Sequence, residues 1–147
     1  MAERGRVKHV YRTFLRWDGW NRWTQSAEDF PALACSTPPE FRGEPHVWTP
    51  EHLFLAAIES CIVGAFMAYA THAGIDVHSY KSSAEATMVV EGKALKFVDA
   101  VVRPRIAVAA DDRRTAAVLL EKSHARCPLV RSVNFPIRME PVWTEAE

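Results

Sequence analysis

The sequence predicts an α+β fold with antiparallel sheets, and three observations carry that prediction. A long apolar helix pattern stands in the middle of the chain, strand patterns lie on both sides of it, and a second helix pattern follows later. Strands and helices in such an order are typical of α+β domains. The chain has 147 residues, a usual length for one domain, and 48% of them are hydrophobic, which allows a sizeable core. Residues 1–147 are therefore expected to form a single domain.

The long helix is predicted to run from Pro50 to about His72. Thr49 is a favourable N-cap, Pro50 suits the first helical position, and Gly74 is a natural stop. At 1.5 Å per residue, about 23 residues span roughly 35 Å, the length of a small domain. Glu59 interrupts the apolar run, so we interpret this segment as a buried core helix rather than a membrane span.

β-branched and aromatic residues predict a hairpin before this helix, with strands over residues 8–17 and 21–26 around the turn signal Asp18-Gly19. Residues 33–35 can add a short third strand. The elements predicted after the helix are strands over 82–92 and 94–109, a helix from Asp111 or Asp112 to about Ala125, a helical turn over 129–132 and a strand over 134–143. The second helix should end near Ala125, because Pro128 disfavours helical geometry in Cys127, the residue before it.

One face of the long helix carries mostly small residues. After Ser60 the helix is apolar on nearly all sides, a pattern that favours burial all round. Small side chains let the backbone of another helix approach closely. One chain with two main helices has too few secondary-structure elements to surround such a long apolar helix. We therefore expect a homodimer in which a second copy covers this stripe, which consists of Ala57, Cys61, Gly64, Ala65 and Ala68.

Charge and composition argue against several classes of partner. The chain has 18 basic and 18 acidic side chains, and this balance gives no reason to expect nucleic acid or an anionic membrane as a partner. The polar, basic start is not followed by an apolar segment of the signal-peptide kind, so a cytoplasmic location is expected. The 3 cysteines, an odd number without zinc-ligand spacing, argue against a disulfide framework and a metal site, and no cofactor is expected.

Each of the cysteines Cys35, Cys61 and Cys127 allows two interpretations. A lone cysteine is usually a small core hydrophobe, and burial raises the pKa of a thiol and so suppresses its reactivity. A reactive thiol needs a nearby cation that supports the thiolate. Spacing alone favours the inert interpretation for Cys61 and Cys127, and it assigns no role to Cys35.

Two motifs nevertheless resemble the OsmC/Ohr family of organic hydroperoxide reductases. The run TPEHLFLAAIESCIVGAF (Thr49–Phe66) is similar to the family's central helix, with its Pro-Glu-x-Leu start and a peroxidatic cysteine ten residues after the glutamate. The run EKSHARCPLVRSV (Glu121–Val133) is similar to the second family signature, a helix end followed by Cys-Pro. The separation of the two cysteines and the order of elements fit as well, so the resemblance covers nearly the whole chain.

The resemblance implies an OsmC-like fold, an intertwined homodimer in which antiparallel sheets from both chains wrap the two central helices. It also implies a thiol peroxidase of the stress response. In that cycle Cys61 reduces an organic hydroperoxide and becomes a sulfenic acid, and Cys127 then closes a disulfide with it. An external dithiol of the lipoyl type regenerates both thiols.

Members of the family also hold an Arg–Glu pair at the site. Glu51 corresponds to the glutamate, and a carboxylate in the first turn of a helix is equally explained by the helix dipole. The arginine has three candidates: Arg42 in the loop before the helix, and Arg16 or Arg22 in the hairpin. We expect Arg42 or a hairpin arginine within salt-bridge reach of Glu51 or of the Cys61 sulfur, because a desolvated thiolate needs a compensating charge.

Aromatic side chains are dense near this loop: Trp17, Trp20, Trp23, Trp48 and Phe41. Such a cluster usually lies in a hydrophobic core or a dimer interface, and it can also line a binding site for a hydrophobic peroxide. Three functions therefore compete. The first is an organic hydroperoxide reductase, the second an OsmC-like binding or stress module with weak or no peroxidase activity, and the third a dimeric structural protein with inert thiols.

Overall fold

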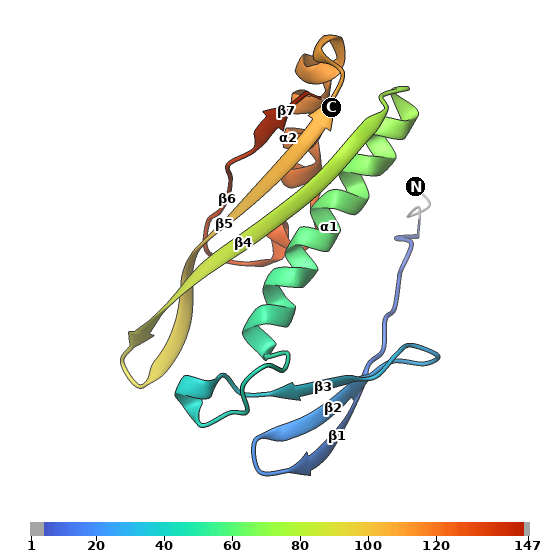
Figure 1. Ribbon diagram of the computed structural model, residues 1–147. Coiled ribbons are helices and arrows are strands. Elements are labelled where there is room, and N and C mark those ends of the chain that lie inside the picture. Colours follow the sequence, from blue (N-terminus) through green and yellow to red (C-terminus); the bar gives the residue numbers. More distant parts are fainter. Residues whose placement is uncertain (1–4, 146–147) are drawn as a thin grey trace. The chain divides into compact units, whose positions relative to one another are not determined.

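The computed structural model describes residues 5–145, and its internal contacts divide the chain into two compact units (Figure 1). The N-terminal unit extends to Leu53 and the C-terminal unit begins at Phe54. Helix α1 (Pro50–His72) starts in the first unit and continues in the second. The single domain expected over residues 1–147 stays a prediction.

The N-terminal unit is a three-stranded antiparallel sheet in the order β1-β2-β3. The predicted hairpin is formed by β1 (Phe14–Gly19) and β2 (Arg22–Ser26), and β3 (Leu33–Ser36) is the expected third strand. The first strand begins six residues later than predicted, at 14 rather than 8, because residues 8–13 pair with no other strand in the described part of the chain. An alternating pattern identifies the face of a strand and says nothing of its partner.

The loop after β3 leads into α1 and is built by local hydrogen bonds. It holds the short 3₁₀ helix η1 (Pro39–Phe41). The Ser36 backbone N–H donates to the Trp48 carbonyl at 3.0 Å, which ties the residue before the helix cap to β3. Thr49 then caps α1 as predicted, since its Oγ1 accepts the His52 backbone N–H at 3.1 Å.

The C-terminal unit is built on a long antiparallel hairpin of β4 (Val77–Glu91) and β5 (Ala94–Val108) (Figure 1). The 3₁₀ turn η2 (Ala110–Asp112), helix α2 (Arg113–Arg126) and the 3₁₀ turn η3 (Val130–Ser132) follow. Two short strands, β6 (Ile137–Met139) and β7 (Val142–Thr144), complete the chain.

Both short strands pair with β5 in the parallel direction, so the sheet is mixed. The predicted α+β class with antiparallel sheets is confirmed, and the parallel pairing of the two short strands at the end of the chain is an addition that the sequence did not predict. The chain returns to β5 through α2, and a crossover through a helix is the connection that joins parallel strands. The single strand predicted over 134–143 is also divided, because Glu140 and Pro141 separate β6 from β7.

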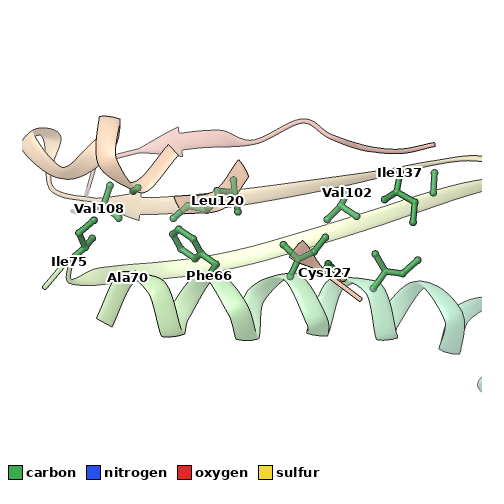
Figure 2. Close-up of a cluster of buried hydrophobic side chains, with 13 residues drawn as sticks. Phe66, Ala70, Ile75, Val102, Val108, Leu120, Cys127 and Ile137 are labelled. Carbon is green, nitrogen blue, oxygen red and sulfur yellow. The ribbon is translucent and has the colours of Figure 1, made fainter. Parts of the chain in front are cut away.

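The core of the C-terminal unit lies between α1, α2 and the inner face of the sheet (Figure 2). α1 buries one residue per turn: Ile58, Ile62, Phe66 and Ala70. β5 contributes alternate residues to the same core, among them Val102, Ile106 and Val108. Figure 2 shows Phe66, Val102 and Val108 standing between helix and sheet.

The opposite face of α1 is open in the single chain. Ala57, Gly64 and Ala68 of the predicted small-residue stripe are exposed, and only 22% of the apolar window of the helix is buried. By length and composition alone α1 could cross a membrane, a test that the core helix of a soluble protein passes as well. Burial all round, as the sequence predicted, is therefore not reached within one chain.

Candidate active site

Two thiols from distant parts of the chain meet in the C-terminal unit. Cys61 lies in the middle of α1, and Cys127 is the residue that ends α2. Cys127 is buried, Cys61 is half-buried, and both thiols are free. The two side chains are close enough for Cys127 to raise the pKa of Cys61. The structure thus brings together the two cysteines that the sequence analysis singled out.

The surroundings of Cys61 favour its neutral form. The pKa of Cys61 is raised from 9.0 to about 11, chiefly by burial and in smaller part by the hydrogen bond and charge of the neighbouring Cys127. The Leu129 backbone N–H acts in the opposite direction, because it donates to the Cys61 sulfur and so stabilises the thiolate. In the single chain the balance lies with burial, and at neutral pH Cys61 is a thiol.

Local geometry explains why Cys127 sits where it does. Cys127 has φ −63° and ψ 119°, an extended conformation, because the residue before a proline avoids helical geometry. Its N–H donates to the His124 carbonyl at 3.3 Å, and its carbonyl accepts the Arg131 N–H at 3.0 Å. His124 Nε2 donates to the Ile137 carbonyl at 2.6 Å, so the end of α2 is fastened to β6.

An aromatic cluster lies in the same unit. Phe54 stacks on Phe97 with ring centroids 5.2 Å apart, and Phe135 packs against both at 6.1 and 5.9 Å. Phe54 precedes Cys61 by two helical turns on the same face of α1. The helix face that carries the thiol is therefore continuous with an apolar, aromatic surface.

In the N-terminal unit, two of the three candidate arginines are engaged. Arg16 Nε lies 2.9 Å from Asp18 Oδ1, and Arg22 Nε lies 3.1 Å from Glu44 Oε2. Arg42 is exposed and takes part in none of the salt bridges formed within residues 5–145. Arg16 and Arg22 thus have local acidic partners, and Arg42 is the candidate whose charge is available.

Glu51 lies in the first turn of α1, as predicted, and its carboxylate is poorly satisfied. Its Oε2 atom is buried and has no hydrogen-bond partner among the residues that the structure describes. The pairing expected between Glu51 and an arginine of its own unit is therefore not formed in the single chain. For the hairpin arginines the physical reason is local: Arg16 binds Asp18 and Arg22 binds Glu44.

The tryptophan-rich cluster of the N-terminal unit is largely open to solvent. Trp17, Trp20, Trp48 and Phe41 are all exposed, and Trp23 is half-buried. They do not form a closed core within this unit. Their expected role as a wall or interface stays a prediction.

Cys35 is the third free thiol. It is fully buried in β3, and this burial raises its pKa. Between Gly5 and Glu145, no group of three or more His, Cys, Asp or Glu side chains could hold a metal ion.

With this geometry in place, the comparison with known families is clear: the chain belongs to the OsmC-like protein family, whose model matches residues 43–141. That range holds both cysteines of the site and Glu51, whereas Arg42 lies just before it. Comparison with curated proteins gave no match.

Solved structures share the fold. An OsmC-like protein from Vibrio cholerae superimposes with a TM-score of 0.83 at 17% identity, over 92% of this chain and 100% of that one. The organic hydroperoxide resistance protein OsmC from Legionella pneumophila gives 0.71 at 21% identity, over 93% and 99%. An organic hydroperoxide resistance protein from Elizabethkingia anophelis gives 0.72 at 16% identity, over 97% and 100%. At these identities the likeness establishes the fold.

Several groups near the thiols escaped the sequence analysis. The Leu129 N–H belongs to the backbone and has no side-chain signature. Phe97 and Phe135 meet only through tertiary packing. Phe54 was the one accessible signal, because a residue seven positions before Cys61 shares its helix face.

Proposed function

We propose that this protein is a thiol-dependent peroxidase that reduces organic hydroperoxides to alcohols. The observation that supports this most directly is the meeting of two free thiols, Cys61 and Cys127, in one core. Membership of the OsmC-like family supports it, as do structural relatives that are named for organic hydroperoxide resistance. The aromatic surface of Phe54, Phe97 and Phe135 suits the organic part of such a substrate.

The proposed reaction has three steps. The Cys61 thiolate attacks the distal peroxide oxygen, the O–O bond breaks, the alcohol leaves with a proton, and sulfur is oxidised to sulfenic acid. The Cys127 thiol then attacks that sulfur, an S–S bond forms, the S–O bond breaks and water leaves. An external dithiol, of the lipoyl type in our proposal, exchanges with the disulfide and returns both cysteines to thiols while it becomes a disulfide itself.

The positions of the cysteines support these roles. Cys61 is held in the middle of a 23-residue helix, which fixes its sulfur. Cys127 ends a helix, and the chain beyond it holds only a three-residue 3₁₀ turn before β6, so fewer backbone hydrogen bonds hold this segment than hold the middle of α1. The rigid thiol suits the attack on peroxide, and the more adjustable thiol suits the closing of a disulfide, whose Cα atoms must come within about 7 Å.

A cation must support the Cys61 thiolate, and we propose Arg42 for this role, with Glu51 as its partner. Burial raises the pKa of Cys61, and an opposite charge nearby is the usual means of lowering it. Arg42 lacks a salt bridge within residues 5–145, and Glu51 has a buried oxygen without a partner there. These two unsatisfied charges complement each other.

We also propose that the protein works as a homodimer in the cytoplasm. The open face of α1 carries Ala57, Gly64 and Ala68, which would admit a second α1 at close range. A cytoplasmic location would supply the dithiols that the cycle consumes.

The test is a dithiol-coupled assay with cumene hydroperoxide. Cys61→Ser should abolish peroxide consumption, whereas Cys127→Ser should consume about one equivalent per site and then stall as Cys61 over-oxidises. Cys35→Ser is the matched control and should leave turnover unchanged. Full activity in Cys61→Ser would overturn the assignment.

A second candidate function is an OsmC-like binding or stress module with weak or no peroxidase activity. The observation that favours it is the pKa of Cys61, which burial raises to about 11. Wild-type protein that consumes no peroxide with any dithiol, and forms no Cys61–Cys127 disulfide, would support this alternative.

A further inference from the structure

Two side chains of the β1–β2 turn hold the backbone of the loop that carries Arg42. The Trp20 indole N–H donates to the Arg42 carbonyl at 3.3 Å, and the Asn21 side-chain amide donates to the same oxygen at 3.2 Å. The Asn21 amide also reaches the Phe41 carbonyl at 3.4 Å. One carbonyl of the loop therefore accepts two donors from a turn that lies more than 20 residues earlier in the chain.

Both ends of this contact are conformationally unusual. Arg42 has φ 65° and Trp20 has φ 48°, in the left-handed region that residues other than glycine seldom adopt. Such backbone persists only where its surroundings over-determine it, and it is frequent at functional sites. Trp20 is itself fixed, because the Trp17 indole donates to its carbonyl at 2.8 Å.

The backbone of the two residues after Arg42 is also constrained. A Cβ atom on Gly43 would lie 1.5 Å from the Thr37 carbonyl oxygen, so only glycine fits there. The Glu44 N–H donates to the Oγ of the buried Ser36 at 2.8 Å. The main chain around Arg42 is thus held from several directions, while its side chain is exposed and takes part in none of the described salt bridges.

We infer that Trp20 and Asn21 are positioning residues for Arg42, and that the β1–β2 turn fixes the point from which this guanidinium acts in peroxide reduction. The inference rests on the proposed function, because it takes Arg42 as the cation of that chemistry. The same observations favour Arg42 among the three arginine candidates. Arg16 and Arg22 are bound to acidic residues of the same unit, whereas the backbone of Arg42 is held by hydrogen bonds and its side chain is left exposed.

The first test examines the loop without any peroxide. Trypsin cleaves after arginine, so the rate of cleavage at the Arg42–Gly43 bond reports how often this loop opens. Trp20→Phe and Asn21→Ala, each of which removes a donor to the Arg42 carbonyl, should speed that cleavage about fivefold, as expected for one lost hydrogen bond. Gln25→Ala is the matched control, because Gln25 makes the same kind of bond to the Phe14 carbonyl, at 3.0 Å, elsewhere on the hairpin.

The second test is a double-mutant cycle on the reactivity of Cys61. The variants are Asn21→Ala, Arg42→Ala and the double mutant, and the measurement is the rate of Cys61 alkylation against pH. Asn21→Ala alone should shift the profile to higher pH and slow alkylation about fivefold at pH 7. In the Arg42→Ala background it should change nothing further, because residues that act through one another are not additive.

The outcomes separate the two claims. Equal and independent losses in both backgrounds, or an Asn21→Ala variant that behaves like Gln25→Ala in the trypsin test, would overturn the positioning role while Arg42 keeps its proposed part. An Arg42→Ala variant with the wild-type pH profile would instead remove Arg42 from the chemistry, and the inference with it. Selective loosening at Arg42 together with non-additivity supports the inference.

Discussion

The pKa of Cys61 leads to a quantitative prediction for Arg42→Ala. A thiol with a pKa of about 11 is ionised in about one molecule in 10⁴ at pH 7, against about one in 10² for the ordinary value of 9.0. The anion is the reactive form, and burial favours the neutral form, so reactivity rises with pH until the pKa is passed. A cation beside the sulfur lowers the pKa and brings the rise to lower pH. Loss of Arg42 should therefore move the midpoint of the pH profile of Cys61 reactivity back toward about 11.

The size of the effect follows from the same relation. Each pH unit by which the midpoint rises should slow the reaction at pH 7 about tenfold, with cumene hydroperoxide and with iodoacetamide alike. The assay follows alkylation of the Cys61 peptide by mass spectrometry between pH 6 and pH 11, in wild type, Arg42→Ala and Arg42→Lys. The lysine variant keeps the charge and should recover part of the shift. The reasoning is refuted by a midpoint that is the same in wild type and Arg42→Ala.

Three further predictions concern stability and assembly. Phe66→Ala empties a fully buried position and should cost about 3–5 kcal/mol of unfolding free energy in urea titrations, and a loss below about 1 kcal/mol would contradict the packing described. Gly64→Ala should weaken the proposed dimer in sedimentation experiments. If α1 instead stays uncovered, the added methyl group meets nothing within 4 Å and should stabilise the protein by about 1 kcal/mol. Gly43→Ala forces a methyl group against the Thr37 carbonyl and should destabilise the N-terminal unit by at least about 1–3 kcal/mol in thermal unfolding, whereas an unchanged midpoint would show that the loop is looser than described.

Helix α1 was the element most completely predictable from sequence. Its bounds, Pro50 and His72, follow from local chemistry: Thr49 caps the first turn and Gly74, with φ 72°, ends the last. Local signals of this kind need no knowledge of the rest of the fold. The meeting of Cys61 and Cys127, in contrast, was predictable only through the family resemblance, since spacing alone favoured inert thiols.

Pairing partners were the part that sequence patterns could not supply. Residues 8–13 have the composition of a strand and form none in the described structure, because strand formation depends on a neighbour that accepts the hydrogen bonds. The parallel direction of β6 was accessible in principle, since a strand, a helix and a strand in succession form a crossover. The contacts of Trp20 and Asn21 with the Arg42 carbonyl left no trace in the sequence, because their acceptor is a main-chain atom.

The strand that follows Cys127 has a consequence for how redox state can be observed. β6 is only three residues long and lies beside β5, where an ion pair of Arg138 with Asp99 at 2.9 Å and the bond from His124 to the Ile137 carbonyl hold it. β6 lies at the edge of its sheet, and short edge elements of this kind open locally at a small fraction of the global free energy of unfolding. Closure of a disulfide at Cys127 would pull on this segment while leaving α1 in place. Amide hydrogen exchange in residues 128–139 should therefore differ between the reduced and oxidised protein, and the exchange of α1 should serve as the internal reference.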